Sequence, residues 1–145
     1  MTVFVLITTH RIAPGASAEV SALLGRYERR LRDEGPGLLV FQAHLGDHDD
    51  RLTLLHVFAD AEAADVHLRF VAPLLFEASS LVRNARIEAY GKPGPALQEA
   101  IDRNAASGVT VLVQQPVAGF SRTGSSRTGS SRAGSSRAGS SRAAR

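Results

Sequence analysis

Hydrophobic positions in the N-terminal part of the chain follow two spacings, one typical of strands and one of a helix. Residues 3–10 are rich in β-branched side chains and predict a strand. Between Ser17 and Asp33 the apolar residues recur every three or four positions, which predicts an amphipathic helix. Two apolar runs then flank a loop of glycine, aspartate and histidine, a pattern typical of a β-hairpin over residues 38–59. The apolar positions of the helix are Val20, Leu23, Leu24, Tyr27 and Leu31.

The pattern after the hairpin predicts two more helices and a fourth strand. Asp60 suits the N-cap of a helix through about Phe70, and Pro73 is expected to begin a second, short helix. Residues 81–90 predict a strand that is more polar than the others, followed by a Gly/Pro-rich linker. The order strand, helix, strand, strand, helix, strand predicts an α+β fold over residues 1–92. In this ferredoxin-like arrangement an antiparallel sheet carries helices on one side.

Two more segments follow this domain. Residues 93–120 predict a C-terminal extension of one short helix and one strand. Because a lone strand is not stable, this strand pairs either with the chain's own sheet or with that of a partner. Residues 121–145 repeat serine, arginine and glycine, carry no aromatic side chain, and predict a disordered tail. We favour an inert tail over an arginine-rich arm for nucleic acid, because it lacks aromatic rings that stack on bases.

The hairpin is apolar on both faces, which favours a dimer. A sheet with one face in water alternates apolar and polar residues, whereas residues 38–45 and 52–59 do not. Helices can cover one face, and a second copy of the chain is the simplest cover for the other. We therefore expect a homodimer that forms through the sheet face.

Composition and charge narrow the class of protein. The chain has no cysteine, which excludes disulfides and cysteine nucleophiles, and no apolar run near the roughly 20 residues that a membrane span needs. Six of the 17 basic side chains lie in residues 122–145, where no acidic residue occurs. The remaining 11 basic and 14 acidic side chains leave the rest of the chain at −3, so we expect no nucleic-acid partner for the folded part. We expect a cytoplasmic protein without a signal peptide or a membrane anchor.

Three features of the sequence carry a resemblance to a known family. Residues 34–37 (Glu-Gly-Pro-Gly) end the first helix, the hairpin follows, and Phe58 and Asp60 lead into a helix that carries His67. In this pattern the chain resembles the antibiotic biosynthesis monooxygenase domain, within the dimeric α/β-barrel group. It departs from the family pattern at His56, where an acid is usual, and at Phe58, where tryptophan is usual.

The resemblance implies oxidation of an aromatic phenol or quinol, with molecular oxygen as co-substrate and no metal or organic cofactor. A protein of this kind encloses the ring, removes a proton and excludes water. Histidine is the natural base, because small shifts move its pKa across neutrality. We take His56 or His67 as the catalytic base. Haem degradation is not expected, because Thr8 and Thr9 stand where that branch has an asparagine.

Histidines on the hairpin add a candidate pocket for an aromatic substrate. If Leu45 pairs with Arg51 across the loop, His44 and His56 lie on one sheet face among leucines, which suits an aromatic ligand. The alternative for each is a core histidine that hydrogen-bonds to the backbone. A helix-capping or dimer-contact role is equally consistent with His67. The residues expected to contact the ring are Phe41, Phe58 and Phe70.

The last strand of the domain carries the remaining candidates. Asn84, Arg86 and Tyr90 are predicted on one face, where they would bind a phenolate or a carboxyl group. The alternative is an edge strand whose polar side chains face water.

Two other functions remain open on the same fold. Loss of the usual tryptophan and acid favours a non-catalytic binding or stress-response module, and isomerisation of a small metabolite is a third reading. A metal site is not predicted, because acids beside histidines in a loop are typical of turn chemistry. The residues concerned are His44, Asp47, His48 and Asp49.

Overall fold

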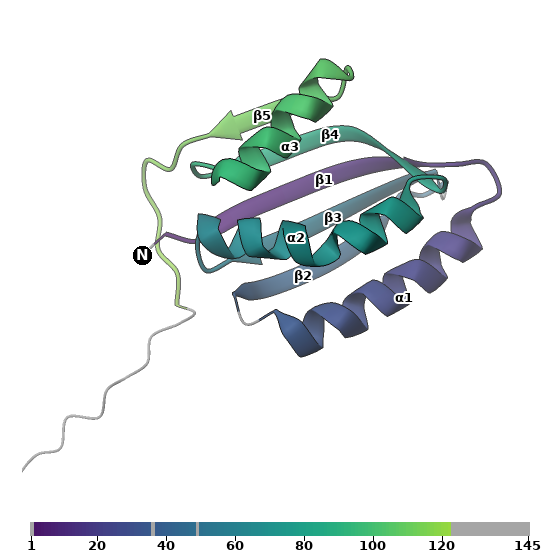
Figure 1. Ribbon diagram of the computed structural model, residues 1–145, viewed down its shortest axis with the longest axis horizontal. Coiled ribbons are helices and arrows are strands. Elements are labelled where there is room, and N and C mark those ends of the chain that lie inside the picture. Colours follow the sequence, from purple (N-terminus) through teal and green to yellow (C-terminus); the bar gives the residue numbers. More distant parts are fainter. Residues whose placement is uncertain (1, 36, 49, 123–145) are drawn as a thin grey trace, which may run out of the picture.

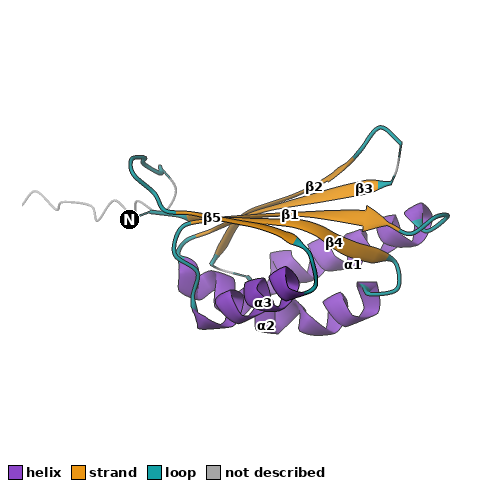
Figure 2. Cartoon of the chain, turned by 90° about the horizontal axis from the view of Figure 1, so that it is seen from above, coloured by secondary structure: helices purple, strands orange, loops and turns teal. Residues whose placement is uncertain are grey.

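The computed structural model describes residues 2–35, 37–48 and 50–122, which form a five-stranded sheet with three helices on one face (Figure 1; Figure 2). The order of elements confirms the predicted β-α-β-β-α-β domain and the helix and strand that follow it. The predicted tail lies outside the described residues from position 123 onward. No helix of the described ranges is long and apolar enough to cross a membrane. The elements are β1 (Phe4–Ile12), α1 (Ser17–Glu34), β2 (Leu38–Leu45), β3 (Arg51–Phe58), α2 (Ala61–Ala78), β4 (Val82–Tyr90), α3 (Pro95–Ala106) and β5 (Thr110–Gln114).

The strands lie in the order β2-β3-β1-β4-β5. The first four pair antiparallel, which completes the ferredoxin-like sheet, and β5 adds parallel to β4. β5 therefore pairs with the chain's own sheet, which is one of the two arrangements that the sequence left open. Because β4 lies between β1 and β5, its polar residues do not mark an edge strand.

The register of the hairpin differs by one residue from the predicted register. Leu45 pairs with Leu52 rather than with Arg51. The reason lies at the end of the loop, where the Gly46 amide donates a hydrogen bond of 2.8 Å to the Arg51 carbonyl, so that Gly46 rather than Leu45 lies opposite Arg51. A shift of one residue moves every side chain of a strand to the opposite face of the sheet.

This shift changes which residues accompany His56. Phe41 pairs with His56 and shares the face that the helices cover, whereas His44 pairs with Thr53 and is exposed on the open face. The expectation that His44 and His56 share one face is therefore wrong.

A second irregularity separates the candidates on β4. Thr9 pairs with Arg86, but His10 pairs with Asn84, so one residue of β4 bulges between them. The bulge reverses the alternation of side chains. Asn84 consequently lies on the helix-covered face with His10, and Arg86 lies on the open face, so the prediction of one shared face is wrong.

α2 is one continuous helix with Pro73 inside it, not the two helices that the sequence predicted. Proline removes one backbone hydrogen bond and normally ends or kinks a helix. Here Val71 and Leu74, on either side of Pro73, both pack into one hydrophobic cluster with α1 residues. Packing on both sides of Pro73 therefore stabilises the helix where the proline removes a backbone hydrogen bond.

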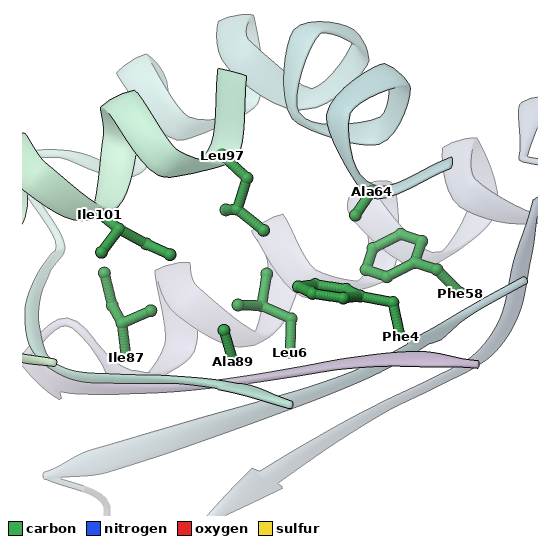
Figure 3. Close-up of a cluster of buried hydrophobic side chains, with 8 residues drawn as sticks. All are labelled: Phe4, Leu6, Phe58, Ala64, Ile87, Ala89, Leu97 and Ile101. Carbon is green, nitrogen blue, oxygen red and sulfur yellow. The ribbon is translucent and has the colours of Figure 1, made fainter. Parts of the chain in front are cut away.

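The main core lies between the sheet and the helices, and Figure 3 shows it in close-up. Phe58, which is 0% exposed, packs beside the ring of Phe4 with 6.5 Å between the ring centroids. α3 contributes two aliphatic side chains, so the extension shares the core of the domain rather than forming its own. The eight buried residues are Phe4, Leu6, Phe58, Ala64, Ile87, Ala89, Leu97 and Ile101.

Candidate active site

Two histidines and a tyrosine meet between the sheet and the helices. The Tyr27 hydroxyl of α1 lies 3.1 Å from Nε2 of His56 on β3 and 3.1 Å from Nε2 of His67 on α2. The two imidazole rings are 4.9 Å apart between centroids. One hydroxyl thus joins side chains from three elements that are distant in sequence.

The spacing of each residue in its helix or strand places these three side chains on faces that meet between the sheet and the helices. Tyr27 belongs to the apolar stripe of α1 that faces the sheet. His67 follows the buried Ala64 by three positions and precedes the buried Val71 by four, so it lies on the inner face of α2. His56 lies on the same face of β3 as the buried Leu52 and Phe58, and is itself 3% exposed.

Aromatic rings enclose the cluster. The Phe41 ring centroid is 5.2 Å from that of Tyr27 and 5.2 Å from that of His56. Phe58 stacks on His56 at 5.8 Å with an angle of 3° between the planes. Rings on these sides remove water from the imidazoles, which makes their charged forms costly.

Burial keeps all three groups uncharged at neutral pH. Burial, reinforced by the electrostatic effects of His67 and His10 and opposed by the Leu6 backbone, lowers the pKa of His56 to about 3. Burial lowers the pKa of His67 to about 4 and raises the pKa of the Tyr27 hydroxyl. A neutral imidazole has one N–H and one lone pair, and a hydroxyl has one proton, so Tyr27 donates to one histidine and accepts from the other.

A cavity of about 330 Å³ adjoins this cluster, between the sheet and the helices. Its volume is at the lower end of the range for small-molecule sites. The wall is mostly aliphatic, with side chains such as Leu54 of β3 and Ile101 of α3. Two sets of polar groups interrupt it. The first is Tyr27, His56 and His67, and the second is Thr8, His10, Asn84, Arg103 and Asn104.

The model of one known protein family matches nearly half of the chain. The model of the antibiotic biosynthesis monooxygenase family matches residues 3–70, a range that includes Tyr27, His56 and His67. Residues 3–70 form an antibiotic biosynthesis monooxygenase domain. The resemblance drawn from the sequence is therefore confirmed. No curated protein matches the chain in sequence.

Solved structures share the fold of this antibiotic biosynthesis monooxygenase domain at low sequence identity. MupZ from Pseudomonas fluorescens is 20% identical, covers 85% of this chain and 97% of its own, and gives a TM-score of 0.67. PA3566 from Pseudomonas aeruginosa is 21% identical over 61% of this chain and 92% of its own, with a TM-score of 0.54. Rv0793 from Mycobacterium tuberculosis is 16% identical over 66% and 99%, with a TM-score of 0.56. Since β4 ends at residue 90 of 145, the 85% coverage by MupZ is too large for that alignment to be confined to residues 1–90.

The structure brings four of the sequence-derived candidates of the monooxygenase domain together. His56 and His67 share the Tyr27 hydroxyl, and Phe41 and Phe58 contact the His56 ring. These contacts fit the roles that the sequence suggested, which remain predictions.

Phe70 and the open-face candidates lie elsewhere. Phe70 packs under the Arg30 guanidinium, 4.6 Å from the ring centroid, and lines a neighbouring cavity that also touches His67. His44 lies on the open face, where its Nε2 is 3.3 Å from the side chain of Gln42. Arg86 also lies there, and its Nε donates to Glu88 at 2.9 Å. Among the described residues no three histidine or acidic side chains lie close enough to hold a metal ion.

Sequence reasoning missed two residues of the monooxygenase domain's site. Tyr27 reads as one more apolar position in a helical stripe, although it is the only hydroxyl-bearing member of that stripe. His10 reads as a strand end, yet it is 7% exposed and lines the cavity. In both cases the signal available was a polar atom at a position whose spacing predicts burial.

Proposed function

We propose that this chain is a monooxygenase that oxidises a flat aromatic phenol or quinol with molecular oxygen, without a metal or an organic cofactor. The observation that carries the proposal is a mostly aliphatic cavity that contains two uncharged histidines joined by one hydroxyl. The wall suits an apolar ring, and the uncharged imidazoles suit the removal of a proton. The family of residues 3–70 supports the reaction class.

In this proposal His67 is the base. It is half-buried and lines the cavity, whereas His56 is 3% exposed and more strongly desolvated. The substrate hydroxyl gives its proton to the neutral imidazole. The phenolate and the imidazolium then attract each other in a cavity with little water, which offsets the low proton affinity of the empty site. His56 supports the new charge through the Tyr27 hydroxyl.

Oxygen then reacts with the phenolate. Electrons pass from the ring to oxygen, a carbon–oxygen bond forms at a ring carbon, and the oxygen–oxygen bond breaks. One oxygen atom stays on the ring as a quinone carbonyl. The other leaves as water with the two hydrogens that the substrate loses, one from its hydroxyl and one from the ring carbon.

The first test replaces each histidine of the pair with glutamine. We expect His67→Gln to lower turnover by roughly 100-fold or more, and His56→Gln to lower it by a smaller factor, because only His67 takes the proton directly. Oxygen uptake is measured with anthrone- and quinol-type substrates in air, with a chelator present. His44→Gln, on the open face, is the matched control and should leave the rate unchanged.

Each other outcome of this test points to a different conclusion. Unchanged turnover in both histidine variants would contradict the assignment even where activity is real. Binding of the aromatic compounds without oxygen uptake by the wild-type chain would favour a non-catalytic module. Conversion of a substrate without oxygen uptake would favour an isomerase.

We also propose that the open face of the sheet binds a second copy of the chain. No helix in the described part of the chain covers this face (Figure 2). Val5 pairs with Val57 and Ile7 with Leu55 at its centre, and all four side chains point away from the helices. An apolar surface of this kind is uncommon on a monomer and typical of an interface between proteins.

Leu55→Glu is expected to convert the proposed dimer to a monomer. The substitution sets a charge in the middle of an apolar interface, and two-fold symmetry brings a second copy of it nearby. Analytical ultracentrifugation measures the mass of the wild-type and variant chains. Ser21→Glu adds the same charge on the exposed side of α1 and should leave the dimer intact. A wild-type chain that sediments as a monomer would overturn this part of the proposal.

A further inference from the structure

The α3–β5 extension forms part of the wall of the candidate site. The buried Asp65 carboxylate of α2 accepts hydrogen bonds from the backbone amides of Ala96 at 3.1 Å and Leu97 at 2.9 Å, which fixes the N-terminal end of α3. Ile101 then packs in the core, and Asn104, almost one turn further on, lines the cavity. These contacts hold the extension on the monooxygenase domain, so that one face of α3 lines the cavity of the candidate site.

Polar groups from β1, β4 and α3 meet at this wall. The Asn84 amide donates to Oδ1 of Asn104 at 2.8 Å, and the Asn104 amide donates to the Ala100 carbonyl at 2.8 Å. Nε2 of His10 lies 2.9 Å from the Thr8 hydroxyl. The β4 bulge is what brings Asn84 to this side of the sheet. We call the following four residues the distal polar group: Thr8, His10, Asn84 and Asn104.

One polar atom of the distal polar group has no partner. Nδ1 of His10 is buried without a hydrogen bond to any described residue. Asn84 is close enough to raise the pKa of His10 against the larger lowering by burial, to about 4, but it does not meet the geometry of a hydrogen bond. Nδ1 of His56, at the other end of the cavity, is also buried without a partner among the described residues. A buried polar atom without a partner destabilises a fold, and a group bound at each end of the cavity would remove this penalty.

The lining residues indicate that this group is uncharged. Arg103 is the one formally charged side chain among the residues that line the cavity, and it is exposed and paired with Glu99 at 3.0 Å. The distal polar group itself offers only amide, hydroxyl and neutral imidazole atoms. Such atoms hydrogen-bond to a hydroxyl or a carbonyl and do not balance a charge.

We propose that the distal polar group is a second recognition subsite, which binds an uncharged hydroxyl or carbonyl at the end of the substrate remote from the reacting hydroxyl. The inference rests on the proposed function, because it takes His67 and His56 as the reacting end. Leu6 pairs with His56, and His10 lies four residues further along β1, about 13 Å away at the rise of a strand. A flat system of two or three rings with an oxygen at each end spans such a distance when one hydrogen bond of about 2.8 Å at each end is included.

The test compares two ligands of nearly equal size in the absence of oxygen, so that binding is measured without turnover. The full chain is titrated by calorimetry with 2-naphthol and with 2,6-dihydroxynaphthalene, which adds a hydroxyl at the opposite end. We expect the diol to bind about tenfold more tightly, an effect typical of one additional hydrogen bond. The diol can bind in two equivalent orientations. This doubles the number of ways in which it can bind and accounts for only about twofold of the difference in affinity.

Two variants are expected to remove the preference for the diol over 2-naphthol, each by deleting a different polar group. Asn104→Leu deletes the amide on α3, and Thr8→Val deletes the hydroxyl next to His10 with almost no change in shape. In both, the diol should lose most of its advantage while the affinity for 2-naphthol stays the same. Gln98→Leu, at an exposed position of α3, should keep the full preference.

The remaining outcomes separate this inference from the proposed function. Equal binding of both ligands by the wild-type chain, or a preference that survives both variants, would overturn the subsite and leave the proposed function intact. Failure of the wild-type chain to bind either ligand would contradict both.

Discussion

Replacing Tyr27 with phenylalanine is expected to slow turnover by roughly 100-fold and to lower the free energy of unfolding by about 1–3 kcal/mol. The hydroxyl is the hydrogen-bond partner of both His56 and His67, at 3.1 Å from each Nε2. Without it, two buried imidazole nitrogens lose their partner and the rings are no longer held in one orientation. Steady-state oxygen uptake gives the first effect, and urea denaturation gives the second.

Tyr90→Phe is the matched control, because the chain has only two tyrosines. The Tyr90 hydroxyl donates to Glu88 at 2.7 Å on the open face, away from the cavity. This variant should keep the wild-type turnover. A Tyr27→Phe variant with the wild-type rate would show that the bridging hydroxyl has no part in the reaction. A loss of stability without a loss of rate would restrict Tyr27 to a structural role.

Mild acid is expected to unfold the protein. Burial lowers the pKa of His10 to about 4, of His56 to about 3 and of His67 to about 4, against 6.5 for each in the unfolded chain. Above pH 6.5 the three histidines are neutral in both states, and their full contribution to stability is present. Below it the unfolded state binds protons that the folded state does not, so stability is lost as the pH falls toward 4.

The size of this effect follows from proton linkage. Each histidine contributes about 1.4 kcal/mol per pH unit between its two pKa values, and three contribute about 4 kcal/mol per unit. Since domains are typically stable by about 5–15 kcal/mol, the chain should lose most of its stability between pH 6.5 and about pH 5. Urea denaturation at several pH values in this interval measures the slope.

Variants show which histidines cause the slope. His10→Gln should remove about a third of it, whereas His48→Gln, at an exposed position of the hairpin loop, should leave it unchanged. A free energy of unfolding that stays constant from pH 7.5 to pH 5 would show that the three imidazoles titrate normally, and that the cavity is wetter than the structure indicates.

Much of the fold could be predicted from the sequence, because apolar spacing reports secondary structure directly. Helical spacing in residues 17–33 and strand-like runs on both sides of the loop at residues 46–50 are local properties of the chain. Their order is enough to select the ferredoxin-like arrangement. Pro73 shows the limit of this reasoning, since packing on both sides of the proline overrides a strong local signal for a helix end.

The candidate site was harder to predict, because it depends on which face each strand residue takes. His56 was found from the sequence as a strand position among leucines, and His67 was found from the resemblance to the family. His44 was grouped with His56 on one face, because the predicted register of the hairpin differs by one residue from the register in the structure. The bulge between β1 and β4 likewise separated Asn84 from Arg86.

By itself, the sequence determined the strands, the helices apart from the continuity of α2 across Pro73, and the order of these elements. The tertiary structure alone decided the register of the hairpin, the bulge on β4, the docking of α3 on Asp65 and the contact of Tyr27 with both imidazoles. The physical reason is that side chains alternate with period two along a strand. One residue more or less in a turn or a bulge reverses a whole face, and that residue is set by backbone hydrogen bonds between segments far apart in the chain.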